Sequence, residues 1–346
     1  MIDPSVLVPG FHEPALPTVN PAAGAAEDEA VDWLWRIGFL TNQAQERHLR
    51  SFEFGLYHGI ATPHVDLDHL VTGLMWFCWG SLADDQYDNY DWGDREPRTR
   101  LAFRELHTIL AGQRPDPATL TPVGRGLCDL WPRLTAGRTE RARQRTSGHF
   151  LDYLQAVVFQ NRFHASGEIP DSATFLTLRR NTIAMLFQAD VLEVVSQSPV
   201  ADQLRDSLSF RELVTCFADI TAWHNDVYGL EKDLADGQTC NAVQVVAASE
   251  RCDLDQAVER VLDRACQRQR MFLSLQRQLP DVADQLGLGP LAAYRADRLA
   301  HDLRAYVHAN LVWIQHTRRY DLDLPRISGT FGDLLGGQPQ PPGAQP

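Results

Sequence analysis

The stretch LMWFCWGSLADDQYD, residues 74–88, joins the most aromatic segment of the chain to three carboxylates. On a helix, residues four apart share a face, so Asp84 and Asp88 point the same way and Asp85 lies beside them. Three carboxylates at the end of an apolar helix are costly unless a cation neutralises them. Hard oxygen ligands suit Mg²⁺, which takes a few carboxylates together with water and phosphate oxygens. The stretch therefore indicates a metal site, and the alternative interpretation is a solvated helix end.

The composition is that of a globular protein with a large core. The chain has 346 residues, of which 44% are hydrophobic and 22% charged, and this length fits one large domain or two smaller ones. A net charge of −13 argues against nucleic-acid binding, which needs a basic surface to neutralise phosphates. The six cysteines are scattered and form no paired motif, so we expect buried reduced thiols rather than zinc ligands or disulfides.

The sequence shows neither a secretion signal nor a membrane span. Residues 1–20 lack a basic start followed by a continuous apolar core. No apolar run reaches the roughly 18 residues that a transmembrane helix needs. We therefore expect a cytoplasmic location.

Apolar residues recur at spacings of three and four along most of the chain, which is the pattern of amphipathic helices. No convincing strand pattern and no persistent heptad occurs, so we predict an all-α fold with helices surrounding a central apolar cavity. The helix opened by Asp171 is less regular around residues 182–185. The expected helices cover 27–40, 42–56, 68–88, 99–112, 119–135, 139–165, 171–195, 204–235, 239–250, 253–279 and 288–319.

The two ends of the chain differ in composition from its middle. Residues 1–24 are rich in Pro, Ala and Gly and are expected to form an extended arm. Residues 25–325 form the expected single helical domain. Residues 326–346 are rich in Gly, Pro and Gln, which predicts a disordered tail.

A second acidic stretch, WHNDVYGLEKD, covers residues 223–233. Asn225, Gly229 and Asp233 lie at i, i+4 and i+8, so a helix places them in one narrow stripe over about two turns. The stripe offers an amide oxygen, room for a water and a carboxylate. The alternative interpretation is a solvated helix face of mixed charge.

Two acidic helix faces that meet across a bundle can hold metal ions that together bind a polyanion. A diphosphate fits, because it bridges several Mg²⁺ ions and takes charge-assisted hydrogen bonds from cationic side chains. The chain places such side chains beside apolar helices at three points, although each alone is typical of surface charge. They are Arg179 with Arg180, Lys232, and the run Arg318-Arg319-Tyr320.

With these motifs, the sequence resembles the class I terpene synthases of bacterial type over about residues 10–325. Residues 84–88 resemble the family's aspartate-rich motif, and residues 225–233 resemble its second metal motif. Arg179 resembles the family's diphosphate-sensing arginine, and Arg319-Tyr320 resembles its late Arg-Tyr pair. The four motifs in this order are far more specific than any one of them.

The sequence departs from the family's pattern at two places. Gly229 stands where the family usually has Ser or Thr, and Asp233 stands where it often has Glu, so a water is expected at the glycine. The effector region, where the family often has Gly, reads Thr182-Ile183-Ala184. The effector is a backbone carbonyl in the family, and the resemblance assigns it to Ile183.

The resemblance implies Mg²⁺-dependent ionisation of a prenyl diphosphate, most often farnesyl diphosphate. It also implies cyclisation of the carbocation to a terpene hydrocarbon or alcohol, with release of diphosphate. Three Mg²⁺ ions are implied, with Mn²⁺ as a substitute, and homodimers are common in the family. The implied metal residues are Asp84, Asp85, Asp88, Asn225, Gly229 through a water, and Asp233. The implied diphosphate contacts are Arg179, Lys232, Arg319 and Tyr320, with Ile183 as the effector.

A carbocation needs a wall that is apolar, unreactive and electron-rich. Aromatic rings meet this need, at roughly 0.5–2 kcal/mol for each cation–π contact. Counting helical turns from the motifs gives the wall candidates Trp76, Phe77, Phe187 and Trp313. The alternative is that these rings are ordinary core residues.

Other functions stay open at the level of sequence. A diterpene synthase would use geranylgeranyl diphosphate, and geranyl diphosphate is a shorter alternative substrate. A chain-elongating prenyltransferase uses similar metals but carries two aspartate-rich motifs, whereas residues 225–233 favour cyclisation or simple ionisation. A non-catalytic helical protein with solvated acidic faces would bind neither Mg²⁺ nor diphosphate tightly.

Overall fold

The computed structural model describes residues 6–11, 18–88, 92–321, 331 and 333–335, without the side chains of residues 88 and 92–98. Helices make up 75% of the structure and no strand occurs in these ranges, which confirms the predicted all-α fold. The helices are α1 (Ala23–Ile37), α2 (Gln43–Arg50), α3 (Phe54–Ala61), α4 (Leu67–Asp88), α5 (Trp92–Leu110), the short 3₁₀ helix η2 (Pro117–Thr119), α6 (Pro122–Thr135), α7 (Glu140–Ser166), α8 (Ser172–Thr182), α9 (Met185–Val195), α10 (Asp202–Arg205), α11 (Leu208–Tyr228), α12 (Leu230–Ala235), α13 (Ala242–Glu250), α14 (Leu254–Gln285) and α15 (Pro290–Ile314).

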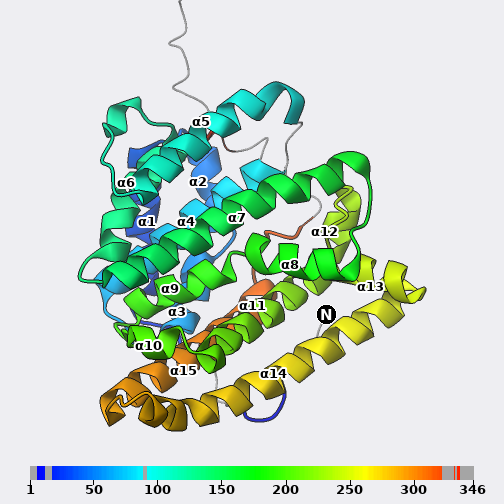
Figure 1. Ribbon diagram of the computed structural model, residues 1–346. Helices are drawn as coiled ribbons and strands as arrows, with labels where there is room; N and C mark the ends of the chain where they lie inside the picture. The colour runs from blue at the N-terminus through cyan, green and yellow to red at the C-terminus, as the bar shows by residue number, and fades with distance from the viewer. Residues whose placement is uncertain (1–5, 12–17, 89–91, 322–330, 332, 336–346) are drawn as a thin grey trace, which may run out of the picture.

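Figure 1 shows how these helices are arranged. Helix α14 forms the lower outer edge of the view and packs along α11, with α13 and α15 also against it. Helix α1 packs on α4, and α3 packs on α15. Helix α9 contacts α4, α7, α11 and α15, so these elements surround one interior region.

Side-chain caps explain where many of the helices begin. A side-chain oxygen just before the helix accepts a hydrogen bond from a backbone N–H of the first turn, which would otherwise have no partner. Asp171 caps α8 in this way, as its place in the sequence predicts, with 3.0 Å to the nitrogen of Ala173 and 3.1 Å to that of Thr174. The other capping residues of this kind are Asn42, Asp116, Thr121, Thr139, Ser207, Asn241 and Asp253.

Three expected helices are interrupted, and the backbone shows why. The prediction of one continuous helix over 42–56 is wrong, because Glu53 adopts a left-handed conformation with φ 53° and separates α2 from α3. The helix predicted over 204–235 is divided into α10, α11 and α12, with Ser207 starting the second of these. The irregularity predicted at 182–185 is a break between α8 and α9, where Ala184 has φ 58°.

Segments near both ends of the chain pack on the helical core. Val8 and Phe11 are buried, and the backbone nitrogen of Val8 donates to the side chain of Gln269 over 2.7 Å. Within the expected disordered tail, the described residues Phe331, Leu334 and Leu335 are buried in the same core. The prediction of disorder is therefore wrong for these three residues, because their apolar side chains bury enough surface to be held in place.

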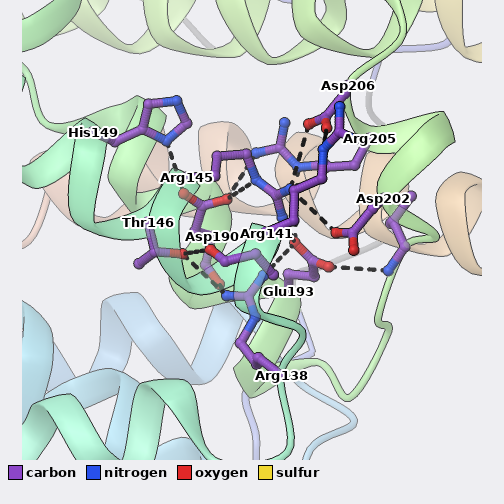
Figure 2. Close-up of polar contacts among 12 residues, drawn as sticks. Arg138, Arg141, Arg145, Thr146, His149, Asp190, Glu193, Asp202, Arg205 and Asp206 are labelled. Atoms are coloured by element: carbon purple, nitrogen blue, oxygen red, sulfur yellow. Dashed lines mark hydrogen bonds and ion pairs between the residues drawn. The ribbon is translucent and has the colours of Figure 1, made fainter. Parts of the chain in front are cut away.

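A buried network of ion pairs fastens α7 to α9 and α10 (Figure 2). Asp190 on α9 lies 2.8 Å from His149 and 3.0 Å from Arg205, and Arg145 contacts both Asp190 and Glu193. Burial opposes ionisation of Asp190, but Arg205, His149 and Arg145 outweigh it and hold the pKa of this carboxyl well below 3.8. The network fixes the helix that follows the break at Ala184.

All six cysteines are free thiols. Cys78, Cys216 and Cys240 are buried as expected, whereas Cys128, Cys252 and Cys266 are only partly buried. None of the helices that the structure describes combines the length and the apolar character needed to cross a bilayer.

Candidate active site

One cavity of about 210 Å³ lies among α3, α4, α7, α8, α9, α11, α12 and α15. Both acidic stretches reach it. Asp84 and Asp85 line it from α4, and Asn225, Gly229 and Asp233 line it from the end of α11 and from α12. The two helix faces that the sequence singles out therefore meet at one cavity.

Each of the two aspartates at the end of α4 has its own partner. The hydroxyl of Tyr153 donates to Oδ1 of Asp84 over 2.6 Å, and Arg319 forms a two-point contact with Asp85 at 2.7 and 2.9 Å. Burial raises the pKa of the Asp84 carboxyl from 3.8 to about 6, and the charge of Asp85 adds to this shift against the hydrogen bond from Tyr153. The side chain of Asp88 lies outside the described residues.

The second face keeps the predicted spacing although its helix is interrupted. Helix α11 ends at Tyr228 and α12 begins at Leu230, but the nitrogen of Gly229 bonds to the carbonyl of Asn225 over 2.7 Å. The nitrogen of Asp233 bonds to the carbonyl of Gly229 over 2.8 Å. A Cβ atom placed on Gly229 would lie 3.7 Å from both carboxylate oxygens of Asp233, so the three residues form one stripe.

Asp226 and Asn241, which were not among the predicted site residues, support this face. Arg179 donates from Nε to Asp226 over 2.9 Å and from Nη2 to Oδ1 of Asn225 over 2.8 Å. Asn241 donates to Oδ2 of Asp233 over 2.9 Å and to the carbonyl of Asp226 over 2.7 Å. Asp226 lies inside the second motif and its acidic side chain was visible there, whereas only the tertiary structure brings Asn241 to the site.

The charges of the two faces act on one another across the cavity. Burial raises the pKa of Asp233 to about 6, against the hydrogen bond from Asn241 and the charge of Lys232. Burial lowers the pKa of Lys232, but the carboxylates of Asp85 and Asp233 outweigh it and raise that pKa above 10.5. The Nδ2 of Asn225 also donates to the hydroxyl of Tyr320 over 3.1 Å.

Two of the cationic candidates lie elsewhere. Arg180 makes a two-point contact with Asp219 at 2.7 and 2.9 Å, and the same carboxylate lies 2.8 Å from Arg268. Arg318 pairs with Asp321 and its side chain is 57% exposed. Neither arginine lines the cavity. Their neighbours in the sequence, Arg179 and Arg319, do line it.

The break between α8 and α9 also faces the cavity. Ile183 ends α8 and Ala184 precedes α9, and both line the cavity together with Arg179. Among the described residues, no hydrogen bond ends on the carbonyl oxygen of Ile183. A helix end with a carbonyl of this kind offers an acceptor to a ligand.

The aromatic wall agrees only in part with the prediction. Trp76, Phe77 and Trp313 line the cavity. Phe187 does not, because it packs behind Trp76 with 4.3 Å between the ring centroids and is a core residue. Sequence reasoning missed further aromatic wall residues, whose helical spacing alone does not distinguish them from core. They are Tyr57, Trp79, Tyr87, Phe150 and Tyr153.

The oxygen donors of the two faces suit a hard divalent cation such as Mg²⁺. Among the described side chains, no three His, Cys, Asp or Glu residues converge on one point. The site instead offers single carboxylates and one amide on two faces. Mg²⁺ is held in this way, because it keeps several waters and takes its other oxygens from one or two carboxylates and from phosphates.

Comparisons with known proteins agree with this geometry. The sequence profile of terpene synthase family 2, C-terminal metal binding, matches residues 75–270. Pentalenene synthase from Streptomyces arenae is 26% identical over 331 residues, which cover 94% of this chain and 96% of that protein. The (−)-delta-cadinene synthase from Streptomyces clavuligerus is 28% identical, over 91% of this chain and 94% of that protein. The crystal structure of germacradien-4-ol synthase from Streptomyces citricolor aligns with a TM-score of 0.75 and 26% identity, covering 89% of this chain and 98% of that one.

Proposed function

The chain belongs to terpene synthase family 2 and is a class I terpene synthase of bacterial type, and on this premise we propose that it ionises farnesyl diphosphate with Mg²⁺ and cyclises the resulting carbocation. One observation carries the proposal. The faces that contain Asp84 and Asn225 line one cavity together with Arg179 and Arg319. A diphosphate in this position would have oxygen ligands for its metal ions on two sides and guanidinium groups beside it.

We assign metal binding on α4 to Asp84 and Asp88, and on the opposite face to Asn225 and Asp233 with a water at Gly229. When bound, Mg²⁺, with three ions by the family's pattern and Mn²⁺ as a substitute, neutralises the leaving diphosphate and acts as a Lewis acid. The carboxylates of the chain fix the position of this charge.

Asp85 has a second role in this proposal. Both of its oxygens contact Arg319, at 2.7 and 2.9 Å. The carboxylate therefore holds the guanidinium beside the cavity.

We assign recognition of the diphosphate to four donors. The donors are charged or polar side chains whose hydrogen bonds to phosphate oxygens are charge-assisted and strengthen as the C–O bond breaks. Arg179 would exchange its bond to Asn225 for one to the diphosphate. The donors are Arg179, Lys232, Arg319 and Tyr320. The carbonyl of Ile183, as the effector, would instead face the positive charge that develops on the prenyl carbon as the C–O bond breaks.

The carbocation is stabilised in this proposal by the aromatic wall. Trp76, Phe77 and Trp313 present rings to the cavity, and Tyr57 and Phe150 extend them. Each ring face contributes roughly 0.5–2 kcal/mol to a cation close to it. The rings also exclude bulk water, which would otherwise quench the allylic cation before cyclisation.

The test is incubation of the purified protein with geranyl, farnesyl and geranylgeranyl diphosphates, each with and without Mg²⁺, followed by gas chromatography of the extract. We expect a terpene product from farnesyl diphosphate that depends on Mg²⁺. Conversion of geranylgeranyl diphosphate alone would replace the proposed substrate. Longer prenyl chains on addition of isopentenyl diphosphate would show a transferase and overturn the proposal.

A further inference from the structure

Three polar side chains lie among the aromatic rings of the cavity. Gln188 on α9, Thr221 on α11 and Asn310 on α15 all line it. These helices pack on one another, so the three residues come from adjoining walls. Their presence is unexpected in a cavity that handles a hydrocarbon cation, and it needs an explanation.

Helix direction places these side chains below the diphosphate region. Helix α11 runs toward Asn225, which lies four residues after Thr221, and α15 runs toward Trp313, three residues after Asn310. Helix α9 runs in the opposite direction, away from the break. Gln188 follows Ala184 by one turn, and its backbone nitrogen donates to the carbonyl of Ala184 over 2.9 Å. One turn of helix is about 5 Å, so Thr221 and Gln188 lie about this far along their helices from Asn225 and from the break, and Asn310 lies about this far before the wall residue Trp313.

Within the part of the chain that the structure describes, no hydrogen bond accounts for the burial of the Gln188 Nε2 or of the Asn310 amide. Gln188 is 2% exposed, and its Nε2 finds no hydrogen-bond partner among the described residues. Asn310 is 5% exposed, and no hydrogen bond to its side chain occurs within the described part of the chain. Thr221 is satisfied, because its hydroxyl donates to the carbonyl of Phe217 over 2.9 Å, and its oxygen remains an acceptor.

A buried amide without a partner is unfavourable, and native proteins usually satisfy such groups with protein or with water. A buried water needs two to four polar partners and roughly 10–15 Å³, and the cavity of about 210 Å³ gives far more than this. Gln188, Asn310 and the Thr221 oxygen supply the partners. The same groups have no role in holding a diphosphate or a metal.

We propose that Gln188 and Asn310 bind a water molecule at the floor of the cavity and that this water captures the carbocation, so that the main product is a cyclic terpene alcohol. The inference rests on the proposed function and names its product class. The water lies a helical turn away from the diphosphate, so the allylic cation formed there cyclises before the charge reaches the water. An acyclic alcohol is therefore not the expected product.

The capture step is balanced by what the reaction itself provides. A lone pair of the water oxygen forms the new C–O bond with the cationic carbon, and the amide groups orient that lone pair. The resulting oxonium loses one proton to an oxygen of the diphosphate released at ionisation. No oxidant or further reactant takes part.

The test begins with the unaltered protein, farnesyl diphosphate and Mg²⁺ in ¹⁸O-enriched water, with mass spectrometry of the product. We expect a cyclic alcohol that carries one ¹⁸O atom. A hydrocarbon as the main product, or an alcohol without ¹⁸O, would overturn this inference and leave the proposed function intact. No conversion of any prenyl diphosphate would instead overturn the proposed function, and the inference with it.

Variants then test the assigned residues. Gln188→Met keeps the length of the side chain and removes both amide groups, and Asn310→Leu does the same at the second position. We expect each to lower the ratio of alcohol to hydrocarbon by roughly five- to tenfold, the effect of one lost hydrogen bond to the water. Met185→Leu changes the shape of the same wall without removing a polar group and should leave the ratio unchanged. Equal ratios in all four proteins would show that these amides do not hold the reacting water.

Discussion

The guanidinium of Arg319 lies 2.7 Å from the carboxylate of Asp85, although 234 positions separate the two residues in the chain. Their side chains are 16% and 8% exposed. The contact joins the end of α4 to the segment that follows α15 at the edge of the cavity. Breaking a pair this buried is costly, because it leaves the remaining charge without compensation.

We expect Asp85→Asn and Arg319→Gln to have strongly non-additive effects on stability. Each single change should lower the free energy of unfolding by about 3 kcal/mol or more, since one buried charge loses its partner. The double variant should lose little more than either single variant, which corresponds to a coupling of about 3 kcal/mol. Denaturant unfolding of the four proteins measures this. Arg318→Gln, at the exposed neighbouring arginine, is the control and should change little.

Turnover should be abolished in Asp84→Ala and in Asn225→Ala, because each change removes an oxygen that we assign to metal binding on one face. The helical fold should persist in both, which far-ultraviolet circular dichroism checks. Asp152→Ala removes an exposed carboxylate from α7 and should have the original rate. If either site variant turned over substrate at the rate of the unaltered protein, at the same Mg²⁺ concentration, the ligand assignment would be refuted.

Gly229→Ser should lower the Mg²⁺ concentration needed for half-maximal turnover. Gly229 has φ −78°, which any residue can adopt, and a Cβ there would lie 3.7 Å from both carboxylate oxygens of Asp233. A hydroxyl on that carbon could take the place of the proposed water. The same Cβ would lie 3.0 Å from the carbonyl oxygen of Asn225, so a small backbone shift is expected. Gly229→Ala imposes that shift without the hydroxyl and is the matched control. If both variants needed the same Mg²⁺ concentration for half-maximal turnover, the result would argue against a ligand at this position.

Phe77→Ala should change the mixture of products. The Phe77 ring lies between Phe54 and Tyr57, with 5.0 Å between centroids in each case, and borders the cavity. Its removal changes both the shape of the wall and the cation–π contact. Gas chromatography of the extract compares the profiles. Phe159→Ala, at an exposed ring on α7, is the control and should leave the product profile unchanged. An unchanged profile in Phe77→Ala would exclude Phe77 from the wall.

The ion network of α9 predicts a loss of stability in acid. The folded pKa of Asp190 lies below its ordinary value of 3.8. The stability that this carboxylate contributes is therefore complete above pH 3.8 and is lost as the pH falls from there toward the folded pKa. Asp190→Asn should cost about 3–5 kcal/mol at neutral pH, because the buried charge of Arg205 loses its nearer carboxylate and keeps Glu193 at 3.7 Å.

The difference in unfolding free energy between Asp190→Asn and the unaltered protein should narrow as the pH falls below 3.8. Urea unfolding over a pH series measures this difference, and other carboxyl groups titrate equally in both proteins. A difference that stays constant through the acid range would contradict the role assigned to Asp190.

Several features of the fold and site could be predicted from sequence because they depend on local chemistry. The spacing of apolar residues predicted helices, and Asp171 marked the start of one by its capping side chain. The stripe formed by Asn225, Gly229 and Asp233 follows from 3.6 residues per turn. The resemblance to a known family then predicted which helix faces would meet.

Other features could not be predicted, because they depend on which surfaces pack together. Periodicity gives the apolar face of a helix but not the partner of that face, so Phe187 was placed on the wall although it packs behind Trp76. Asn241 reaches Asp233 only because the chain turns back after α12. The apolar residues of the C-terminal segment were too few to predict that Phe331 would be buried.

The sequence by itself determined that this protein is helical and that it carries two oxygen-bearing helix faces with arginines beside them. Local spacing fixes these features, since each depends on residues within a few turns of one another. Only the tertiary structure decided that Arg319 pairs with Asp85, that Arg180 pairs with Asp219 instead of lining the cavity, and that Gln188 and Asn310 line it. Those contacts join residues far apart in the chain, and they depend on how whole helices pack.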